Sequence, residues 1–249
     1  MKAWVPRSFI ERGGLVTNWG SCVADSVAEH ALLLALAALR NLKHWDRVIR
    51  GETCGNNTLE LGTRTLFGRR VGIHGFGAVA RALIRLLRPF QVSISAYSQG
   101  VPSRMFQEWQ VNECGSIREL FSKSEVVFEC EGLTPATKAS VGANEIVALP
   151  DGAVFVNVGR GLVVDEETLV REAAKGRIRL ALDVVSHEPL TPQNPVYSAK
   201  DAILSPHIAG PTRDLYPRIG EQILHNLRRF LKGTLPASPV TLEVYDRST

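Results

Sequence analysis

Three side chains that could together perform acid–base chemistry each follow a short apolar run. Arg160, Glu188 and His207 come just after runs that are typical of buried strands. An imidazole, whose unperturbed pKa is about 6.5, can accept or donate a proton near neutral pH. A planar guanidinium is suited to binding a carboxylate. Taken singly, each residue is also typical of a surface ion pair, a solvated loop or a turn. Their shared position after strands indicates one site.

The elements that must position these side chains alternate between strands and helices. Several strands are apolar throughout, which favours a parallel sheet covered on both faces by right-handed crossovers. In such a doubly wound α/β sheet, ligands bind outside the carboxyl ends of the strands, and the expected strand order is 3-2-1-4-5-6. The predicted strands are Val71 to His74, Val92 to Ala96, Val126 to Phe128, Ala153 to Val158, Leu180 to Val184 and Ala202 to Leu204.

A glycine turn follows the first predicted strand. Gly75 and Gly77 interrupt the apolar pattern, helical spacing resumes at Ala78, and Ala80 completes the spacing G-x-G-x-x-A. In dinucleotide-binding folds the first glycine permits a tight turn. The second lets a pyrophosphate approach, and the third small residue allows close helix–strand packing. Free amides at the helix start would hold the pyrophosphate. The motif alone is weak evidence, because any glycine turn between a buried strand and a helix looks similar.

Further elements flank this region. Gly14 to Asn18 is predicted as a strand, and Ile219 to Leu231 as the last helix. Ser26 and Glu29 have the spacing of a capping box and predict a helix that runs to Leu42. This helix is apolar around most of its circumference, so it must be buried in a core, between domains or between subunits.

Together these motifs resemble the D-isomer-specific 2-hydroxyacid dehydrogenases, from about Gly14 to Leu231. The resemblance rests on the turn Val71 to Ala80 and on the segments that contain Arg160, Glu188 and His207, which occur in family-like order. It implies a Rossmann NAD(P)-binding domain and reversible hydride transfer between a nicotinamide and a 2-oxo acid. Family members include glyoxylate/hydroxypyruvate reductases and phosphoglycerate dehydrogenases.

The resemblance also implies a role for each polar residue. His207 would be the general acid that protonates the carbonyl oxygen as hydride reaches the carbon, and the base in the reverse direction. Glu188 would be its partner, because a nearby carboxylate favours imidazolium and fixes the ring. Arg160 would bind the substrate carboxylate through its planar fork.

Cofactor contacts follow from the same resemblance. Asp183 would face the nicotinamide amide, although it could also be an ordinary strand-end residue. The remaining predicted cofactor-binding residues are Gly75, Phe76, Gly77, Ala78 and Val79 of the phosphate turn, together with Ser98, Arg104, Leu133, Thr134, Val158, Gly159, Arg160, His207, Ala209 and Gly210. No metal site is expected.

The end of the second strand departs from the NAD-using pattern. That pattern places an acid there to hold the ribose 2′-OH, whereas this chain has Ser98, with Arg104 nearby. Losing the acid removes repulsion against a 2′-phosphate, and an arginine could pair with it. We therefore expect NAD(P) as cofactor, with a preference for NADP(H).

A second departure concerns the substrate-binding domain with which family members begin. Most of it is missing here, so we expect residues 1–25 and 211–249 to be remnants of it, flanking a dinucleotide-binding domain at 26–210. The cleft would have one wall, and turnover by this chain alone should be very weak or absent. A partner chain or an N-terminal extension could supply the other wall. The rival hypothesis is a nucleotide-binding protein without turnover, acting as a redox sensor or interaction module.

Composition narrows the partners. The chain has 45% hydrophobic and 22% charged residues and a net charge of +4, which is ordinary for a globular protein and indicates no nucleic-acid partner. Several arginines near the glycine turn could be solvated faces or a phosphate-attracting field. They are Arg64, Arg69, Arg70, Arg81, Arg85 and Arg88.

The predicted location is the cytoplasm. The longest apolar segment, Ala31 to Leu39, is too short to span a bilayer, and the first residues do not have the pattern of a signal peptide. Four cysteines without metal-type spacing should be reduced thiols; they are Cys22, Cys54, Cys114 and Cys130. We also expect a homodimer that packs through the apolar helix of residues 26–42.

Overall fold

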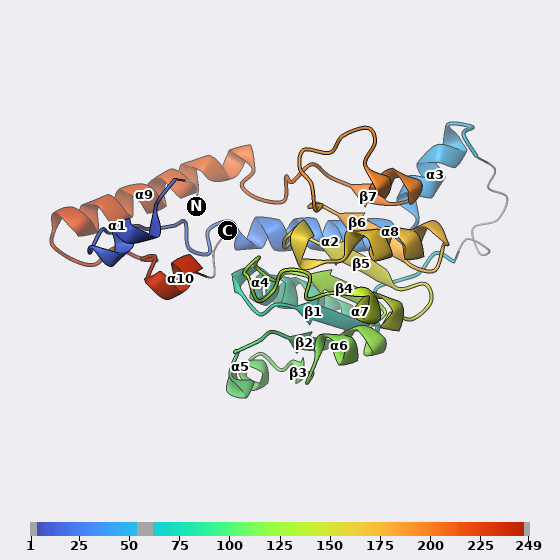
Figure 1. Ribbon diagram of the computed structural model, residues 1–249, viewed down its shortest axis with the longest axis horizontal. Coiled ribbons are helices and arrows are strands. Elements are labelled where there is room, and N and C mark those ends of the chain that lie inside the picture. Colours follow the sequence, from blue (N-terminus) through green and yellow to red (C-terminus); the bar gives the residue numbers. More distant parts are fainter. Residues whose placement is uncertain (1–3, 54–61, 247–249) are drawn as a thin grey trace.

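A seven-stranded, wholly parallel sheet forms the centre of the protein (Figure 1). The computed structural model describes residues 4–53 and 62–246. Along the sheet the order is β3-β2-β1-β4-β5-β6-β7. The strands are β1 (Arg70–His74), β2 (Ser93–Tyr97), β3 (Asn112–Glu113), β4 (Val126–Glu129), β5 (Val154–Asn157), β6 (Arg179–Leu182) and β7 (Ile203–Leu204).

The predicted doubly wound sheet is confirmed, with one correction to the strand count. Asn112–Glu113 forms a short strand that the sequence pattern did not predict, so Val126 to Phe128 belongs to the fourth strand. That segment lies beside β1, not beyond β2. The order 3-2-1-4-5-6 therefore holds for the strands as observed, and β7 extends it. β1, which carries the glycine turn, lies in the interior of the sheet, as expected.

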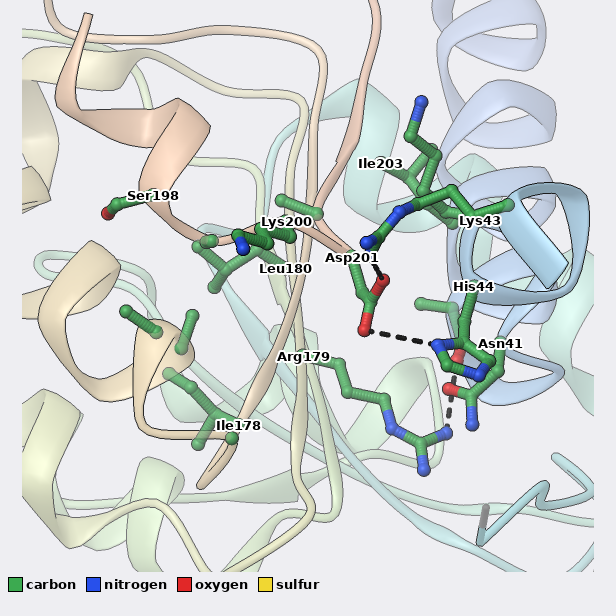
Figure 2. A pocket seen from close by; sticks show the side chains of 17 residues that line it. Asn41, Lys43, His44, Ile178, Arg179, Leu180, Ser198, Lys200, Asp201 and Ile203 are labelled. Carbon is green, nitrogen blue, oxygen red and sulfur yellow. Dashed lines mark hydrogen bonds and ion pairs between the residues drawn. The ribbon is translucent and has the colours of Figure 1, made fainter. Parts of the chain in front are cut away.

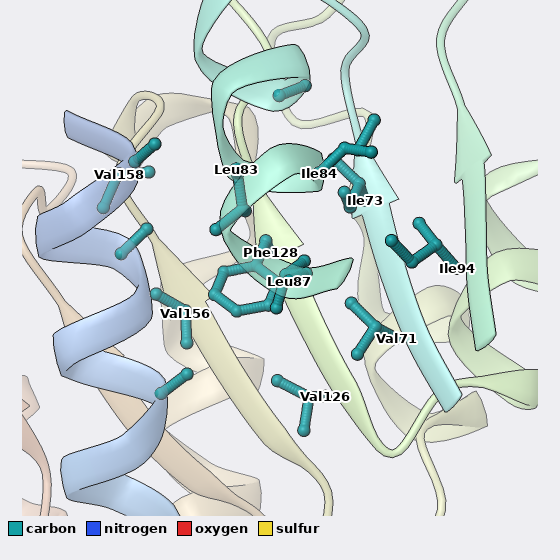
Figure 3. Close-up of a cluster of buried hydrophobic side chains, with 14 of the residues drawn as sticks. Val71, Ile73, Leu83, Ile84, Leu87, Ile94, Val126, Phe128, Val156 and Val158 are labelled. Atoms are coloured by element: carbon teal, nitrogen blue, oxygen red, sulfur yellow. The ribbon is translucent and has the colours of Figure 1, made fainter. Parts of the chain in front are cut away.

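Helices cover both faces of the sheet. Alternate side chains of the buried strands point to opposite faces: Val126 and Phe128 pack with α2 and α4, whereas Val127 packs with α6, α7 and α8. Figure 3 shows the first of these cores, with Leu83 and Leu87 of α4 lying over the strands. These helices are α2 (Ala24–Leu39), α4 (Ala78–Leu87), α6 (Ile117–Lys123), α7 (Ala143–Ala148) and α8 (Glu166–Ala174).

The apolar helix starts earlier and ends earlier than predicted. Ser26 is not its cap: α2 begins at Ala24, and the Ser26 hydroxyl instead donates to the carbonyls of Ala209 (3.1 Å) and Gly210 (2.8 Å). This bond joins α2 to the segment that follows β7. At the other end, Asn41 adopts a left-handed conformation (φ 55°) that breaks the helix, and the separate helix α3 (Leu42–Ile49) follows.

Both ends of the chain pack together at one side of the sheet (Figure 1). Arg7 in α1 (Arg7–Glu11) pairs with Asp246 in α10 (Leu242–Asp246) at 2.9 Å. The predicted strand at Gly14 to Asn18 is wrong, because only an isolated antiparallel bridge joins Thr17 to Pro239. Two backbone hydrogen bonds flank this bridge, from Asn18 N to the Ser238 carbonyl (3.3 Å) and from Val240 N to the Val16 carbonyl (2.8 Å). The remaining helices are α5 (Ser103–Glu108) and α9 (Tyr216–Leu231).

Three of the four cysteines lie within the described residues. Cys22, Cys114 and Cys130 are free, and Cys54 lies outside the described residues. Burial raises the pKa of the Cys114 thiol, and the nearby Glu119 adds to the effect.

Within residues 4–53 and 62–246, no helix is long and apolar enough to cross a membrane.

Candidate active site at the carboxyl edge of the sheet

His207 and Glu188 meet at the carboxyl edge of the sheet. Nδ1 of His207 lies 2.7 Å from Oε2 of Glu188, and Glu188 also accepts the backbone N–H of Val185 through Oε1 (3.2 Å). His207 has a left-handed backbone (φ 57°), a conformation that is uncommon for residues other than glycine and that often marks functional sites. Its side chain is 47% exposed. The ring therefore presents Nε2 on the side away from Glu188, where a ligand could reach it.

Arg160 completes the predicted trio. It follows β5, and its Nη1 donates to the carbonyl of Gly159 at 2.7 Å. Burial lowers the pKa of the Arg160 guanidinium, while attraction to Glu188 partly offsets that effect. Glu188 thus interacts with both Arg160 and His207. A cavity of about 380 Å³ lies against this pair, with Glu188, Leu190 and His207 among its lining residues.

Asp183 organises the loop that carries His207. It is 2% exposed, and its carboxylate accepts three hydrogen bonds from that loop: Ser205 Oγ (2.6 Å), Ile208 N (2.9 Å) and Ala209 N (3.0 Å). The His207 backbone N–H also donates to the Asp183 carbonyl at 2.9 Å. Asp183 therefore fixes the position of His207, a role that its predicted contact with the nicotinamide does not exclude.

The glycine turn combines one crowded glycine with one that faces open space. Gly75 has φ 93°, and a Cβ there would lie 2.8 Å from the backbone nitrogen of Glu131, so only glycine fits. A Cβ on Gly77 would meet nothing within 4 Å. Gly77 is the N-cap of α4, with no side-chain capping bond. The amides of Ala78 and Val79 thus begin a helix whose N-terminus faces open space, the arrangement suited to an anion.

The other predicted cofactor-binding residues differ in their burial and in their contacts. Phe76 is buried and packs against Phe106 (ring centroids 4.5 Å apart). Thr134 forms a tight turn with Thr137, and the two hydroxyl oxygens lie 3.0 Å apart. Leu133 is half-buried and packs against the hydrophobic core that contains Val127. The carbonyl of Gly210 accepts a hydrogen bond from the Ser26 hydroxyl. Val158 and Ala209 are buried in the hydrophobic core that contains Phe128. The carbonyl of Gly159 accepts a hydrogen bond from Arg160.

The two residues on which the predicted NADP(H) preference rests differ in exposure. Ser98 is 9% exposed, and Arg104 is exposed in α5.

Sequence reasoning missed a buried ion pair beneath this edge. His74 ends β1 and Glu129 ends β4, and the two are direct partners in the strand register. His74 Nδ1 lies 2.6 Å from Glu129 Oε2, and the side chains are 3% and 0% exposed. Burial acts to lower the pKa of His74, but attraction to Glu129 and their hydrogen bond outweigh it, so the pKa is raised. The only available signal was a pair of polar residues within apolar runs.

The arginines near the turn mostly contact other parts of the fold. Arg69 and Arg70 bind Glu125 at the amino ends of β1 and β4, and Arg85 binds Asp25 at 2.7 Å. Arg81 donates to the carbonyl of Phe76 at the glycine turn (3.2 Å). Arg64 and Arg88 donate to carbonyls elsewhere. All six arginines therefore have partners within the fold, and the partner of Arg81 lies in the glycine turn itself.

A larger cavity, of about 590 Å³, lies at the opposite edge of the sheet (Figure 2). It is formed at the amino ends of β6 and β7 and contains none of the predicted site residues. Its carboxylate, Asp201, is bound by Arg47 (2.8 Å) and by His44 (3.6 Å). Size alone therefore does not locate the chemistry. Among the described residues, no cluster suited to a metal ion is present.

Comparison with known proteins gives a consistent result. Residues 32–209 match the family described as D-isomer specific 2-hydroxyacid dehydrogenase, NAD binding domain. A glyoxylate/hydroxypyruvate reductase from Arabidopsis thaliana is 32% identical over 238 residues, which are 93% of this chain and 71% of the relative. The crystal structure of a glyoxylate reductase from Paecilomyes thermophila superposes with TM-score 0.81 at 28% identity, covering 94% of this chain and 70% of that one.

A further solved structure carries a dinucleotide. It is a D-isomer specific 2-hydroxyacid dehydrogenase from Xanthobacter autotrophicus in complex with NADPH and MES, with TM-score 0.76 and 27% identity. The match covers 92% of this chain and 93% of that one.

Proposed function

Because this chain belongs to the D-isomer-specific 2-hydroxyacid dehydrogenase family, we propose that Arg160, Glu188 and His207 are its catalytic residues. The reaction would transfer hydride between a nicotinamide dinucleotide and a small 2-oxo or 2-hydroxy acid. One observation carries the proposal: the 2.7 Å contact between His207 and Glu188, at the sheet edge that also holds the glycine turn.

The geometry suggests how the protons move. When bound, a reduced nicotinamide supplies the hydride for the carbonyl carbon of the substrate. His207 holds a proton on Nε2 and gives it to the carbonyl oxygen, so the carbonyl becomes a hydroxyl. Glu188 contacts Nδ1, and this contact orients the ring so that Nε2 faces the substrate. In the reverse direction His207 takes the hydroxyl proton.

Arg160 would position the substrate. Its guanidinium is partly desolvated, which strengthens its attraction to a carboxylate. The planar fork can bind both oxygens and polarise the neighbouring carbonyl. Asp183 acts indirectly, because its bonds to the 205–209 loop keep His207 in place.

The proposed cofactor is NAD(H) or NADP(H), held by Gly75, Gly77 and the amides that start α4. The sequence preference for NADP(H) rests on Ser98 and Arg104 and stays a prediction. The NADPH in the Xanthobacter relative supports it, whereas the surroundings of Ser98 argue for the other cofactor. The proposed substrates are glyoxylate and hydroxypyruvate, which the names of the relatives suggest.

An alternative is a nucleotide-binding protein with little or no turnover. The solvent exposure of His207 and Glu188 favours this alternative. Their side chains are 47% and 35% exposed, and water in an active site weakens electrostatic catalysis.

We also propose that residues 26–210 form the dinucleotide-binding domain and that both ends of the chain belong to the second domain. The contact between Arg7 and Asp246 supports it.

We further propose a homodimer in the cytoplasm. Leu33 on α2 is 58% exposed, and Leu42 and Ile49 on α3 are 55% and 84% exposed, so apolar area is available for a second copy. Free thiols at Cys22 and Cys114 suit a reducing compartment.

Two measurements on the purified chain test the main proposal. Titration with NADH and NADPH, followed by nicotinamide fluorescence, should give saturable binding of at least one. Adding glyoxylate or hydroxypyruvate should then oxidise the bound dinucleotide, however slowly. Absence of any dinucleotide binding would refute both the enzyme and the nucleotide-binding alternative. Binding without oxidation would leave the alternative standing.

A further inference from the structure

Ser98 is not alone at the end of β2. Its hydroxyl donates to Oε2 of Glu131 at 2.8 Å. Glu131 follows β4, and β1 lies between β4 and β2 in the sheet. The carboxylate therefore reaches across the carboxyl end of β1, beside the glycine turn, to the position where dinucleotide-binding folds commonly hold a ribose. An acid is thus present at this position, but it comes from a different strand.

The backbone contacts of Glu131 fix where its side chain starts. Its N–H donates to Oε1 of Glu129 at 2.7 Å, and its own Oε1 accepts the N–H of Gly132 at 3.1 Å. The Glu131 backbone also lies directly against Gly75 and Gly159, where a Cβ would approach it to 2.8 Å and 2.7 Å. Glu131 is therefore packed between the phosphate turn and the segment that precedes Arg160.

The hydrogen-bond directions suit hydroxyl groups and do not suit a phosphate. Ser98 uses its only O–H on Glu131, so what remains on both residues is acceptor capacity. The 2′- and 3′-hydroxyls of a ribose are donors and can bind such acceptors. A 2′-phosphate is an anionic acceptor, and it would meet a carboxylate at hydrogen-bonding range, which is repulsive.

Two basic side chains bear on this charge, Arg104 and His74. Arg104 is exposed in α5, and no hydrogen bond or ion pair in the described structure joins it to Ser98 or Glu131. His74 lies beneath the same edge and is attracted by Glu131, but its Nδ1 lies 2.6 Å from Glu129, so the Glu129 carboxylate already balances a charge on its ring. The charge that lies closest to the Ser98 hydroxyl is therefore negative.

We propose that Glu131, reaching from β4 to Ser98, binds the adenosine ribose and makes the chain select NAD(H) over NADP(H). This inference rests on the proposed function, since it requires that a dinucleotide binds at the glycine turn. It opposes the preference for NADP(H) that Ser98 and Arg104 suggested in the sequence, because that preference assumed that no acid lies at the end of β2.

Calorimetric titration with two adenosine probes tests the inference without using activity. 5′-AMP carries a free 2′-hydroxyl, and adenosine 2′,5′-bisphosphate carries the 2′-phosphate. Wild-type protein should bind 5′-AMP more tightly by roughly tenfold or more, since like charges brought together at a binding site oppose association. Glu131→Gln, which keeps the shape and removes the charge, should reduce this ratio by a similar factor.

Glu167→Gln is the matched control, because Glu167 is exposed in the first turn of α8 and its loss changes the net charge equally. It should leave the ratio unchanged. Ser98→Ala keeps the carboxylate and should keep the preference for 5′-AMP. Circular dichroism checks that each variant is folded, and the wild-type ratio stands even if a variant does not fold.

The outcomes separate this inference from the function on which it rests. If neither the probes nor NADH and NADPH bind, the proposed function fails and the inference falls with it. If both dinucleotides bind but the bisphosphate binds as well as 5′-AMP, only the role of Glu131 is overturned. An unchanged ratio in folded Glu131→Gln overturns it as well.

Discussion

His74 on β1 and Glu129 on β4 face each other across adjacent strands and form a buried ion pair, with Nδ1 2.6 Å from Oε2. Two ionisable groups in a sheet interior are stable only while each satisfies the other. The pair lies directly beneath the proposed dinucleotide edge, since Glu129 also accepts the N–H of Glu131.

The first prediction is a pH dependence of stability. Burial alone would lower the pKa of His74, but Glu129 raises it above its value in the unfolded chain. The stabilisation from a raised histidine pKa is fully present below about pH 6.5 and is lost as the pH rises through the folded-state pKa. Urea unfolding of wild type and His74→Gln should therefore differ most below about pH 6.5 and converge at alkaline pH.

The control is His225→Gln, because His225 is exposed in α9. It should remain parallel to wild type at every pH. A gap between wild type and His74→Gln that is constant or widens with pH would show that the pair is not charged. Removing one partner should cost on the order of 3–5 kcal/mol where the pair is ionised.

The second prediction concerns Asp183. Asp183→Asn would replace one acceptor oxygen with an N–H donor that faces the donors of the 205–209 loop. We expect a loss of about 1–3 kcal/mol in the free energy of unfolding, together with weaker dinucleotide binding as the loop shifts. Ser205→Ala, which removes a single bond to Asp183, is the milder comparison. Equal stability of Asp183→Asn and wild type in denaturant titrations would contradict the organising role.

The third prediction concerns assembly. Light scattering at micromolar concentration should give twice the chain mass of 27.3 kDa, and Leu33→Glu should shift the protein toward monomer. Val147→Glu tests whether any exposed apolar position behaves alike, since Val147 is also 58% exposed but lies on α7. A monomeric wild type, or dissociation by both variants alike, would remove the proposed α2 interface.

The fourth prediction concerns the rate of reduction. Glu188 holds Nδ1 of His207 at 2.7 Å and so orients the ring that would donate the proton. In Glu188→Ala, which removes this contact, the maximal rate of reduction should fall while dinucleotide binding is kept. A maximal rate equal to that of wild type would mean that Glu188 does not act through His207.

How far the sequence predicts this molecule depends on the range of the interactions involved. β1, β4 and β5 are continuous apolar runs because both faces are buried, so their pattern is local and readable. The β3 strand, Asn112–Glu113, was missed because it is short and exposed at the sheet edge. Without it, the Val126 segment was counted as the third strand, although it pairs with β1.

The candidate site shows the same division. Arg160, Glu188 and His207 were predicted because each follows a readable strand; in the structure Glu188 contacts His207 and attracts the guanidinium of Arg160. The contact between Ser98 and Glu131 depends on β4 lying beside β1, which no local pattern specifies. Ser26 was misread as a helix cap because its true partners, Ala209 and Gly210, lie far along the chain.

Transfer of the hydride can be followed directly with an isotope label. Wild type and His207→Gln are incubated with glyoxylate and a reduced dinucleotide deuterated at C4 of the nicotinamide, and C2 of the glycolate formed is analysed by mass spectrometry. Because label accumulates, the method detects even very slow turnover. We predict deuterated glycolate from wild type and a decrease on the order of 100- to 10,000-fold in His207→Gln, with dinucleotide binding retained. No label from wild type that binds the dinucleotide would show that the chain does not transfer hydride to glyoxylate, and equal label from the variant would show that His207 is not the proton donor.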